Sequence, residues 1–105
     1  MAIEILGAAE VAAMRRAGLA AAATLATVGA RLSAGLSTAD IDAWVRADTA
    51  RIGGRPSQLG FHGFPAAVCT SRNAIVCHGI PNPRERLEAG DIINVDVTTE
   101  LGGFH

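Results

Sequence analysis

The sequence contains no lysine, few aromatic residues and no excess of charge of either sign. All nine basic residues are arginine, aromatic residues make up 4% of the chain, and the formal net charge is −1. Because the charges are also dispersed, there is no basic stripe for nucleic acid and no polybasic patch for a membrane surface. With 105 residues, 50% of them hydrophobic, we expect one domain whose core is built mainly from small side chains.

Cysteine is scarce and long apolar runs are missing. Cys69 and Cys77 lack the spacing of a disulfide framework, so a reducing compartment is expected. The N-terminus carries Glu4 and lacks the basic region of a secretion signal. The uncharged, alanine-rich run of residues 17–30 is shorter than the roughly 18 residues that a membrane span needs. We therefore predict a soluble, cytoplasmic protein that does not associate with membranes.

Two helices are predicted in the first half of the chain. Apolar residues recur at three- and four-residue spacing over about residues 8–32, which is typical of a helix that packs one side against a core. The predicted stripe consists of Val11, Met14, Ala21, Leu25, Val28 and Leu32. Ser37 is a predicted N-cap for a second helix over about residues 38–52, ended by Gly53 and Gly54. Its buried side would contain Ile41, Trp44, Val45 and Ile52.

The rest of the chain is predicted to form a shaped loop followed by β-hairpins over residues 67–105. Glycines, a proline and two phenylalanines in residues 57–66 exclude a helix there and indicate a loop that could form a pocket. The expected strands cover 67–70, 74–77, 91–99 and the start of a returning strand at 104–105, with turns at 71–73 and 101–103. Helices followed by hairpins predict an α+β domain whose antiparallel or mixed sheet is covered by helices on one side.

The strongest predicted strand carries polar groups on one face. Side chains alternate along a strand, so Ile93, Val95 and Val97 would face the core, whereas Asn94 and Asp96 share the other face. That face is either simply exposed to solvent, or it presents Asp96 as a metal ligand or an acid/base group on a rigid element. A buried carboxylate without a positive partner is unfavourable, and this cost makes Asp96 a candidate functional residue.

Two histidines are also candidates for a site. His78 ends the run 74–77, and Gly79 and Pro81 restrict the backbone that follows it. Its imidazole either makes a structural hydrogen bond or is directed at a ligand. His62 lies between two phenylalanines, where it is placed to line a pocket.

Four motifs follow one another in the second half of the chain. They are Gly60-Phe-His-Gly-Phe-Pro, Val68-Cys-Thr-Ser, Asn73-Ala-Ile-Val-Cys-His-Gly-Ile-Pro and Gly90-Asp-Ile-Ile-Asn-Val-Asp-Val. In this order and spacing they resemble the type I methionine aminopeptidases. The resemblance runs over the whole chain, is generic in the two predicted helices and is specific from about Ser57 onward. The resemblance implies the N-terminal half of a pita-bread fold, in which two α/β halves surround a dinuclear metal site. It also implies removal of the initiator methionine from new proteins whose second residue is small.

The resemblance further implies roles for individual residues. Asp96 matches the first metal-binding aspartate, and His78 matches a histidine that contacts the substrate. The positions that match the pocket for the methionine side chain and the adjacent cleft are Phe61, Phe64, Cys69 and His62. The implied cofactors are divalent metal ions, namely cobalt, manganese, iron or zinc, with two per complete site. The implied partner is the N-terminal methionine of a peptide or nascent protein.

The sequence also departs from the family pattern. Members commonly have tyrosine where Phe61 and Phe64 stand, so the pocket wall would lose two hydroxyl groups. The family pattern places a second aspartate ligand just beyond His105, and a histidine and two glutamates in the second half of the fold. We therefore expect residues 1–105 to form a partial domain that is inactive alone and self-associates through unpaired strands. A non-catalytic peptide-binding module that reuses the pocket is the alternative, and a purely structural α+β domain leaves Asn94 and Asp96 unexplained.

Overall fold

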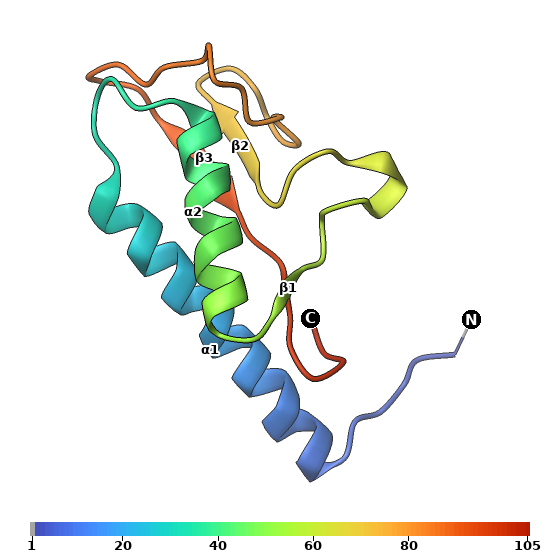
Figure 1. The fold of residues 1–105 in the computed structure, drawn as a ribbon. Helices are drawn as coiled ribbons and strands as arrows, with labels where there is room; N and C mark the ends of the chain where they lie inside the picture. The colour runs from blue at the N-terminus through green and yellow to red at the C-terminus, as the bar shows by residue number, and fades with distance from the viewer. Residues whose placement is uncertain (1) are drawn as a thin grey trace.

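Two helices and two small antiparallel sheets make up the fold (Figure 1). The structure is a computed structural model that describes residues 2–105. The helices run in opposite directions and lie against each other, and residues 2–7 form an extended arm before them. The elements are α1 (Ala8–Arg31), α2 (Thr38–Arg51), β1 (Arg55–Pro56), the 3₁₀ turn η1 (Phe61–Gly63), β2 (Cys69–Arg72), β3 (Ile93–Asp96) and β4 (Thr99–Glu100). The predicted α+β class and both predicted helices are confirmed. Within the described residues, no helix is long and apolar enough to cross a membrane.

The buried face of α1 differs from the predicted stripe. Val28 is buried as expected, but four other members of the stripe, Val11, Met14, Leu25 and Leu32, are exposed. The residues of α1 that are fully buried are Ala17, Thr24 and Val28. The Thr24 hydroxyl donates a 2.7 Å hydrogen bond to Asp48 of α2. The buried face of α1 therefore contains a polar pair, and the prediction from apolar spacing was wrong for most of the stripe.

Helix α2 begins as the sequence predicts. The Ser37 hydroxyl accepts a hydrogen bond from the Asp40 N–H, and the Asp40 carboxylate accepts one from the Ser37 N–H. This reciprocal capping satisfies two amides at the start of the helix. Ile41 and Val45 are fully buried, and Trp44 packs partly buried against the same core.

Strand β2 pairs with β3, and not with residues 74–77 as predicted. Ser71 and Arg72, which were predicted to lie in a turn, belong to the strand. The turn begins at Asn73, which has a positive φ of 52°. The Asn73 N–H donates to the Ile92 carbonyl at 2.9 Å, and its side-chain oxygen accepts from the Ile92 N–H at 3.1 Å. These bonds hold the end of β2 against the segment before β3. Strand β2 therefore pairs with a segment distant in the sequence, and the predicted hairpin with residues 74–77 does not form.

Strand β3 ends at Asp96, three residues earlier than predicted, and the chain then passes to the second sheet. There Thr99 lies opposite Pro56 of β1, and the Ser57 N–H donates to the Thr98 carbonyl at 2.9 Å. The predicted turn at 101–103 is confirmed, but the returning strand is reduced to one bridge between Leu101 and Phe104.

The core lies between the helices and one face of β3. Its buried members are Val28, Ile41, Val45, Ala67, Val68 and Leu87. Ile93, Val95 and Val97 pack against this cluster, which confirms the predicted core face of the strand. Because strand side chains alternate, Asn94 and Asp96 lie on the face directed away from the core, and both are exposed.

Candidate functional site

One cavity of about 900 Å³ contains all the candidate residues named from the sequence. Those that line it are Phe61, His62, Phe64, Cys69, His78 and Asp96. They come from the η1 loop, from β2, from the segment after β2 and from the end of β3, up to 35 positions apart in the chain. The structure thus brings together side chains whose proximity no local pattern in the sequence reveals.

The loop that forms one wall of the cavity is folded tightly. Gly60 and Gly63 have positive φ angles, and so does His62, at 50°. The Gly60 N–H donates to the Phe64 carbonyl at 2.8 Å, which closes the loop on itself. The rings of Phe61 and His62 meet edge to face with centroids 4.2 Å apart. Phe61 is 66% exposed whereas Phe64 is half-buried, so Phe61 lies at the mouth and Phe64 deeper in the wall.

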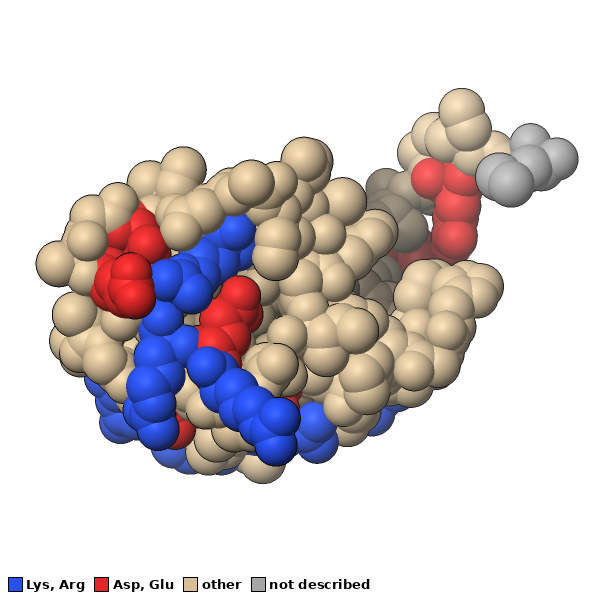
Figure 2. All heavy atoms as spheres, turned by 90° about the horizontal axis from the view of Figure 1, so that it is seen from above, with Lys and Arg blue, Asp and Glu red and all other residues tan. Residues whose placement is uncertain are grey.

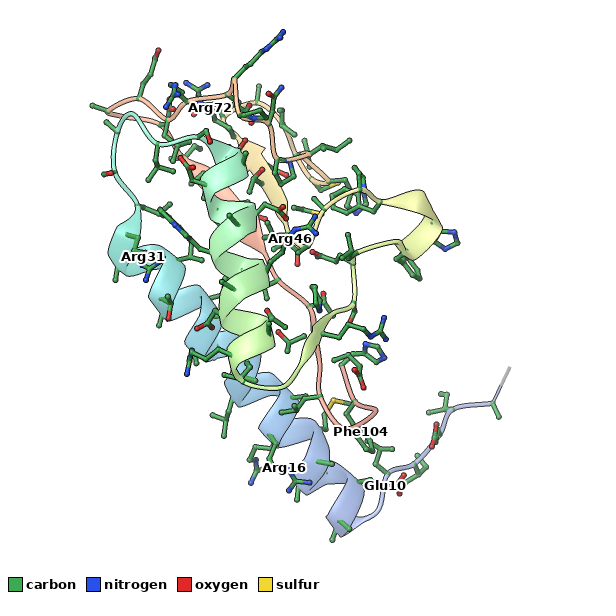
Figure 3. The ribbon with its side chains drawn as sticks, viewed as in Figure 1. Glu10, Arg16, Arg31, Arg46, Arg72 and Phe104 are labelled. Carbon is green, nitrogen blue, oxygen red and sulfur yellow. The ribbon has the colours of Figure 1, made fainter. Side chains whose placement is uncertain are left out.

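Two side chains of α2 fasten this loop to the helix. The Asp42 carboxylate accepts a 2.7 Å hydrogen bond from the Ala67 N–H and a 2.8 Å bond from the Arg46 guanidinium. Arg46 also donates to the Pro65 carbonyl at 3.3 Å, and Figure 3 shows it pointing from α2 towards the loop. Residues four apart lie on the same side of a helix, so this pair holds the base of the pocket wall at two points.

Cys69 lies in the wall opposite Asp96 in the β2–β3 register. Burial, and next the negative charge of Asp96, raises the pKa of the Cys69 thiol above its ordinary value. A thiol with a raised pKa stays protonated at neutral pH and is a poor nucleophile. The residue is therefore suited to contact an apolar ligand group rather than to act as a nucleophile.

Asp96 is the acidic group of the cavity. Its side chain is exposed, and its backbone carbonyl accepts a 3.0 Å hydrogen bond from the Gln58 amide. Nowhere in residues 2–105 do three or more His, Cys, Asp or Glu side chains form a group that could hold a metal ion. The donor set of the described residues therefore does not fit a complete metal site, and Asp96 offers a single carboxylate towards one.

The cavity also contains residues that the sequence reasoning missed. They are Ser57, Gln58, Ile80, Thr98 and His105. The Ser57 hydroxyl lies 2.7 Å from Nδ1 of His105, so the two side chains share a hydrogen bond at the rim. The signal for His105 is a repeated triplet, because Gly-Phe-His occurs at 60–62 and again at 103–105. Nothing in the sequence marks Ser57 or Gln58.

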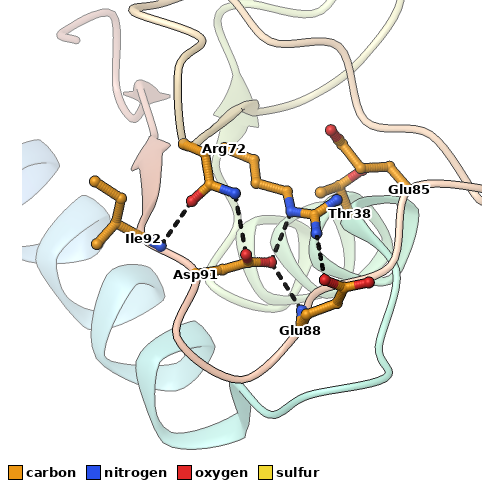
Figure 4. Close-up of polar contacts among 7 residues, drawn as sticks. Thr38, Arg72, Glu85, Glu88, Asp91 and Ile92 are labelled. Carbon is orange, nitrogen blue, oxygen red and sulfur yellow. Dashed lines mark hydrogen bonds and ion pairs between the residues drawn. The ribbon is translucent and has the colours of Figure 1, made fainter.

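The opposite end of the β2–β3 pair is held by a polar network (Figure 4). Asp91 accepts hydrogen bonds from the Asn73 amide at 3.0 Å, from the Glu88 N–H at 2.8 Å and from the Arg72 guanidinium at 2.7 Å. These bonds, that of Asn73 first, lower the pKa of Asp91 to about 2.

Figure 2 shows acidic and arginine side chains lying next to each other on the face seen from above, so this face carries mixed charge.

The sequence matches one protein family and is similar to several known proteins. Residues 12–105 match metallopeptidase family M24. The chain is 41% identical over 103 residues to methionine aminopeptidase A of Synechocystis sp., covering 98% of this chain and 41% of that protein. It is 46% identical over 103 residues to methionine aminopeptidase 1D, mitochondrial, of Danio rerio, covering 98% of this chain and 30% of the relative.

Solved structures show the same similarity in three dimensions. A methionine aminopeptidase from Rickettsia prowazekii superposes with a TM-score of 0.93 at 36% identity, covering 95% of this chain and 40% of that one. A methionine aminopeptidase from Thermotoga maritima also gives 0.93, at 30% identity, covering 97% of this chain and 41% of that one. The chain thus spans about two fifths of the length of the proteins that it matches in structure.

Proposed function

The chain belongs to metallopeptidase family M24, and we propose that it forms the substrate-pocket part of a methionine aminopeptidase. Its fold corresponds to the N-terminal half of a pita-bread fold, as the sequence predicted. The proposed activity is metal-dependent hydrolytic removal of the N-terminal methionine from nascent proteins whose second residue is small. The proposed location is the cytoplasm.

The apolar cavity is the observation that carries this proposal. Phe61, Phe64, Cys69 and Ile80 line it, and a methionine side chain is unbranched, polarisable and makes favourable contacts between its sulfur and aromatic rings. His78 and Asp96 line the same cavity, and we propose that they meet the polar end of a methionyl peptide. We propose that His78 contacts the substrate and that His62 lines the cleft beside it.

Membership of a metallopeptidase family implies divalent metal ions. We propose cobalt, manganese, iron or zinc, two ions per complete site, with Asp96 as one ligand. A pair of such ions needs several carboxylates to bridge and neutralise it. Because residues 2–105 offer no group of three ligands, the 105-residue chain is expected to show no metal-dependent cleavage of Met-Ala-Ser with added manganese or cobalt. Turnover that disappears in Asp96→Ala would contradict this expectation.

Binding of the methionine side chain is tested by calorimetry with Met-Ala-Ser. We expect Phe64→Ala to weaken binding about tenfold or more, because it truncates an aromatic wall residue. Phe104→Ala is the matched control, since Phe104 does not line the cavity. Binding that is equal in both variants, or equal for Met-Ala-Ser and Gly-Ala-Ser, would argue against the pocket.

A non-catalytic peptide-binding module is the second candidate. The observation in its favour is a cavity with an apolar wall but only one acidic side chain. Such a module would bind methionyl peptides equally with and without a chelator. A metal-dependent increase in affinity would favour the aminopeptidase.

Self-association through β3 is a further part of the proposal. Within the described part of the chain, β3 pairs with β2 along one edge and with no strand along the other. An unpaired strand edge presents N–H and C=O groups that can pair with a second molecule. We expect concentration-dependent dimers or aggregates in sedimentation velocity, and a monodisperse monomer over a hundredfold concentration range would contradict this.

A further inference from the structure

The backbone of His78 adopts a conformation that side-chain-bearing residues rarely take. Its φ is +58°, in the left-handed region. No helix or strand contains it, and the neighbouring Val76 and Cys77 are exposed. A local conformation of this kind persists only where surrounding contacts hold it. The contacts that hold His78 therefore decide where its imidazole lies in the cavity.

Gly79 supplies these contacts. Its N–H donates a 3.1 Å hydrogen bond to the Ser71 hydroxyl oxygen, and its carbonyl accepts a 2.9 Å bond from the Thr70 N–H. A Cβ atom at this position would collide with the Thr70 carbonyl. Gly79 is thus held directly against β2 by one bond on each side of its Cα atom.

Of these two bonds, the one from the Gly79 N–H ends on a side chain. Ser71 is 3% exposed and lies two residues after Cys69 on β2. Residues two apart in a strand share a face, so the Ser71 hydroxyl and the Cys69 wall of the pocket lie on the same side. Ser71 therefore links the strand that forms the wall to the residue directly after His78.

We propose that Ser71 is a positioning residue for the pocket, which fixes the left-handed backbone of His78 by holding the Gly79 amide. The inference rests on the proposed function only in taking His78 as the group that meets the substrate. Loss of the Ser71 hydroxyl frees the Gly79 N–H, and the His78 imidazole then leaves its place at the cavity.

The test is nuclear magnetic resonance of the 105-residue chain with Ser71→Ala, Ser71→Thr and Ser37→Ala. Ser37→Ala is the matched control, because Ser37 is also buried and its hydroxyl also accepts one backbone N–H, yet it lies outside the cavity. In Ser71→Ala we expect Gly79 amide exchange at least tenfold faster and the His78 ring signals shifted towards those of an unstructured peptide. Ser71→Thr, which keeps a hydroxyl, restores both, and Ser37→Ala changes neither. His78 ring signals that stay unchanged in Ser71→Ala would overturn the proposal.

The wild-type chain provides a test that needs no variant to fold. The hydrogen bond to Ser71 requires the Gly79 amide to exchange much more slowly than those of Val76 and Cys77. Equal exchange at these positions would overturn the proposal. Adding Met-Ala-Ser tests the proposed function separately, because absence of any change at His78 on addition of peptide contradicts substrate contact while the exchange data still decide the role of Ser71.

Discussion

Replacement of Asp42 tests how the pocket wall is held. Asp42→Ala removes the acceptor for the Ala67 N–H, and Ala67 is 0% exposed in the folded chain. Leaving a buried amide without a partner costs about 1–3 kcal/mol. Loss of the half-exposed Arg46 ion pair adds about 0.3–0.5 kcal/mol, as for other pairs four residues apart on a helix. We therefore expect the free energy of unfolding to fall by about 1.3–3.5 kcal/mol.

Asp42→Asn is the matched comparison. The asparagine keeps an oxygen that can accept from the Ala67 N–H and loses only the charge, so we expect a decrease of about 0.5–1 kcal/mol. Urea unfolding followed by the fluorescence of the single tryptophan, Trp44, measures both values. In thermal melts each kcal/mol corresponds to about 4–8 °C for a chain of this size. Equal losses in the two variants, or a loss below about 0.5 kcal/mol in Asp42→Ala, would refute the assigned role of the Ala67 bond.

Two further predictions concern stability. The pKa of Asp91, about 2 in the folded chain against an ordinary 3.8, makes its network stabilising above about pH 4 and progressively weaker as the pH falls towards 2. The stability difference between the wild type and Asp91→Asn should therefore shrink over this interval in melts recorded at stepped pH, and a constant difference would count against the network. Val45→Ala is expected to cost about 1.5–3 kcal/mol because Val45 is fully buried. Val76→Ala, at a residue 90% exposed, should stay within about 0.5 kcal/mol in the same urea titration, and similar values for the two would contradict the assigned core.

Local signals in the sequence were sufficient for the helices and for the faces of β3. Ser37 caps α2 because a serine hydroxyl followed three residues later by a carboxylate satisfies the first amides of a helix, whatever the rest of the chain does. The alternation of Ile93, Val95 and Val97 reflects the period of a strand in the same way. Both features depend on residues within a few positions of each other.

The errors arise where distant segments compete. Ile75 and Val76 have strong strand propensity, but β2 pairs with β3, whose apolar face packs against the helices. The buried face of α1 was predicted wrongly because the side that faces α2 carries Thr24, whose hydroxyl bonds Asp48, a pair 24 positions apart that apolar spacing does not reveal. Such preferences follow from tertiary packing, which propensity and periodicity describe only weakly.

In the candidate site too, local motifs predicted some residues, whereas others are revealed only by the folded structure. The motifs named every one of Phe61, Phe64, Cys69, His78 and Asp96, and all line one cavity. Their roles towards substrate and metal remain proposals. The supports behind them, Asp42 on α2 and Ser71 on β2, carry no motif, and only the hydrogen bonds of the folded chain reveal them.

The most direct test of the central claim is to locate where a methionyl peptide binds. Met-Ala-Ser is titrated into the isotope-labelled 105-residue chain, and the amide signals that shift are mapped onto the structure. We expect the shifted signals to cluster around the cavity, at residues 57, 58, 61–64, 69, 78, 80, 96, 98 and 105, and Gly-Ala-Ser to shift them much less. Shifts confined to α1 or to the charged network around Asp91, or no shifts at millimolar peptide, would contradict it.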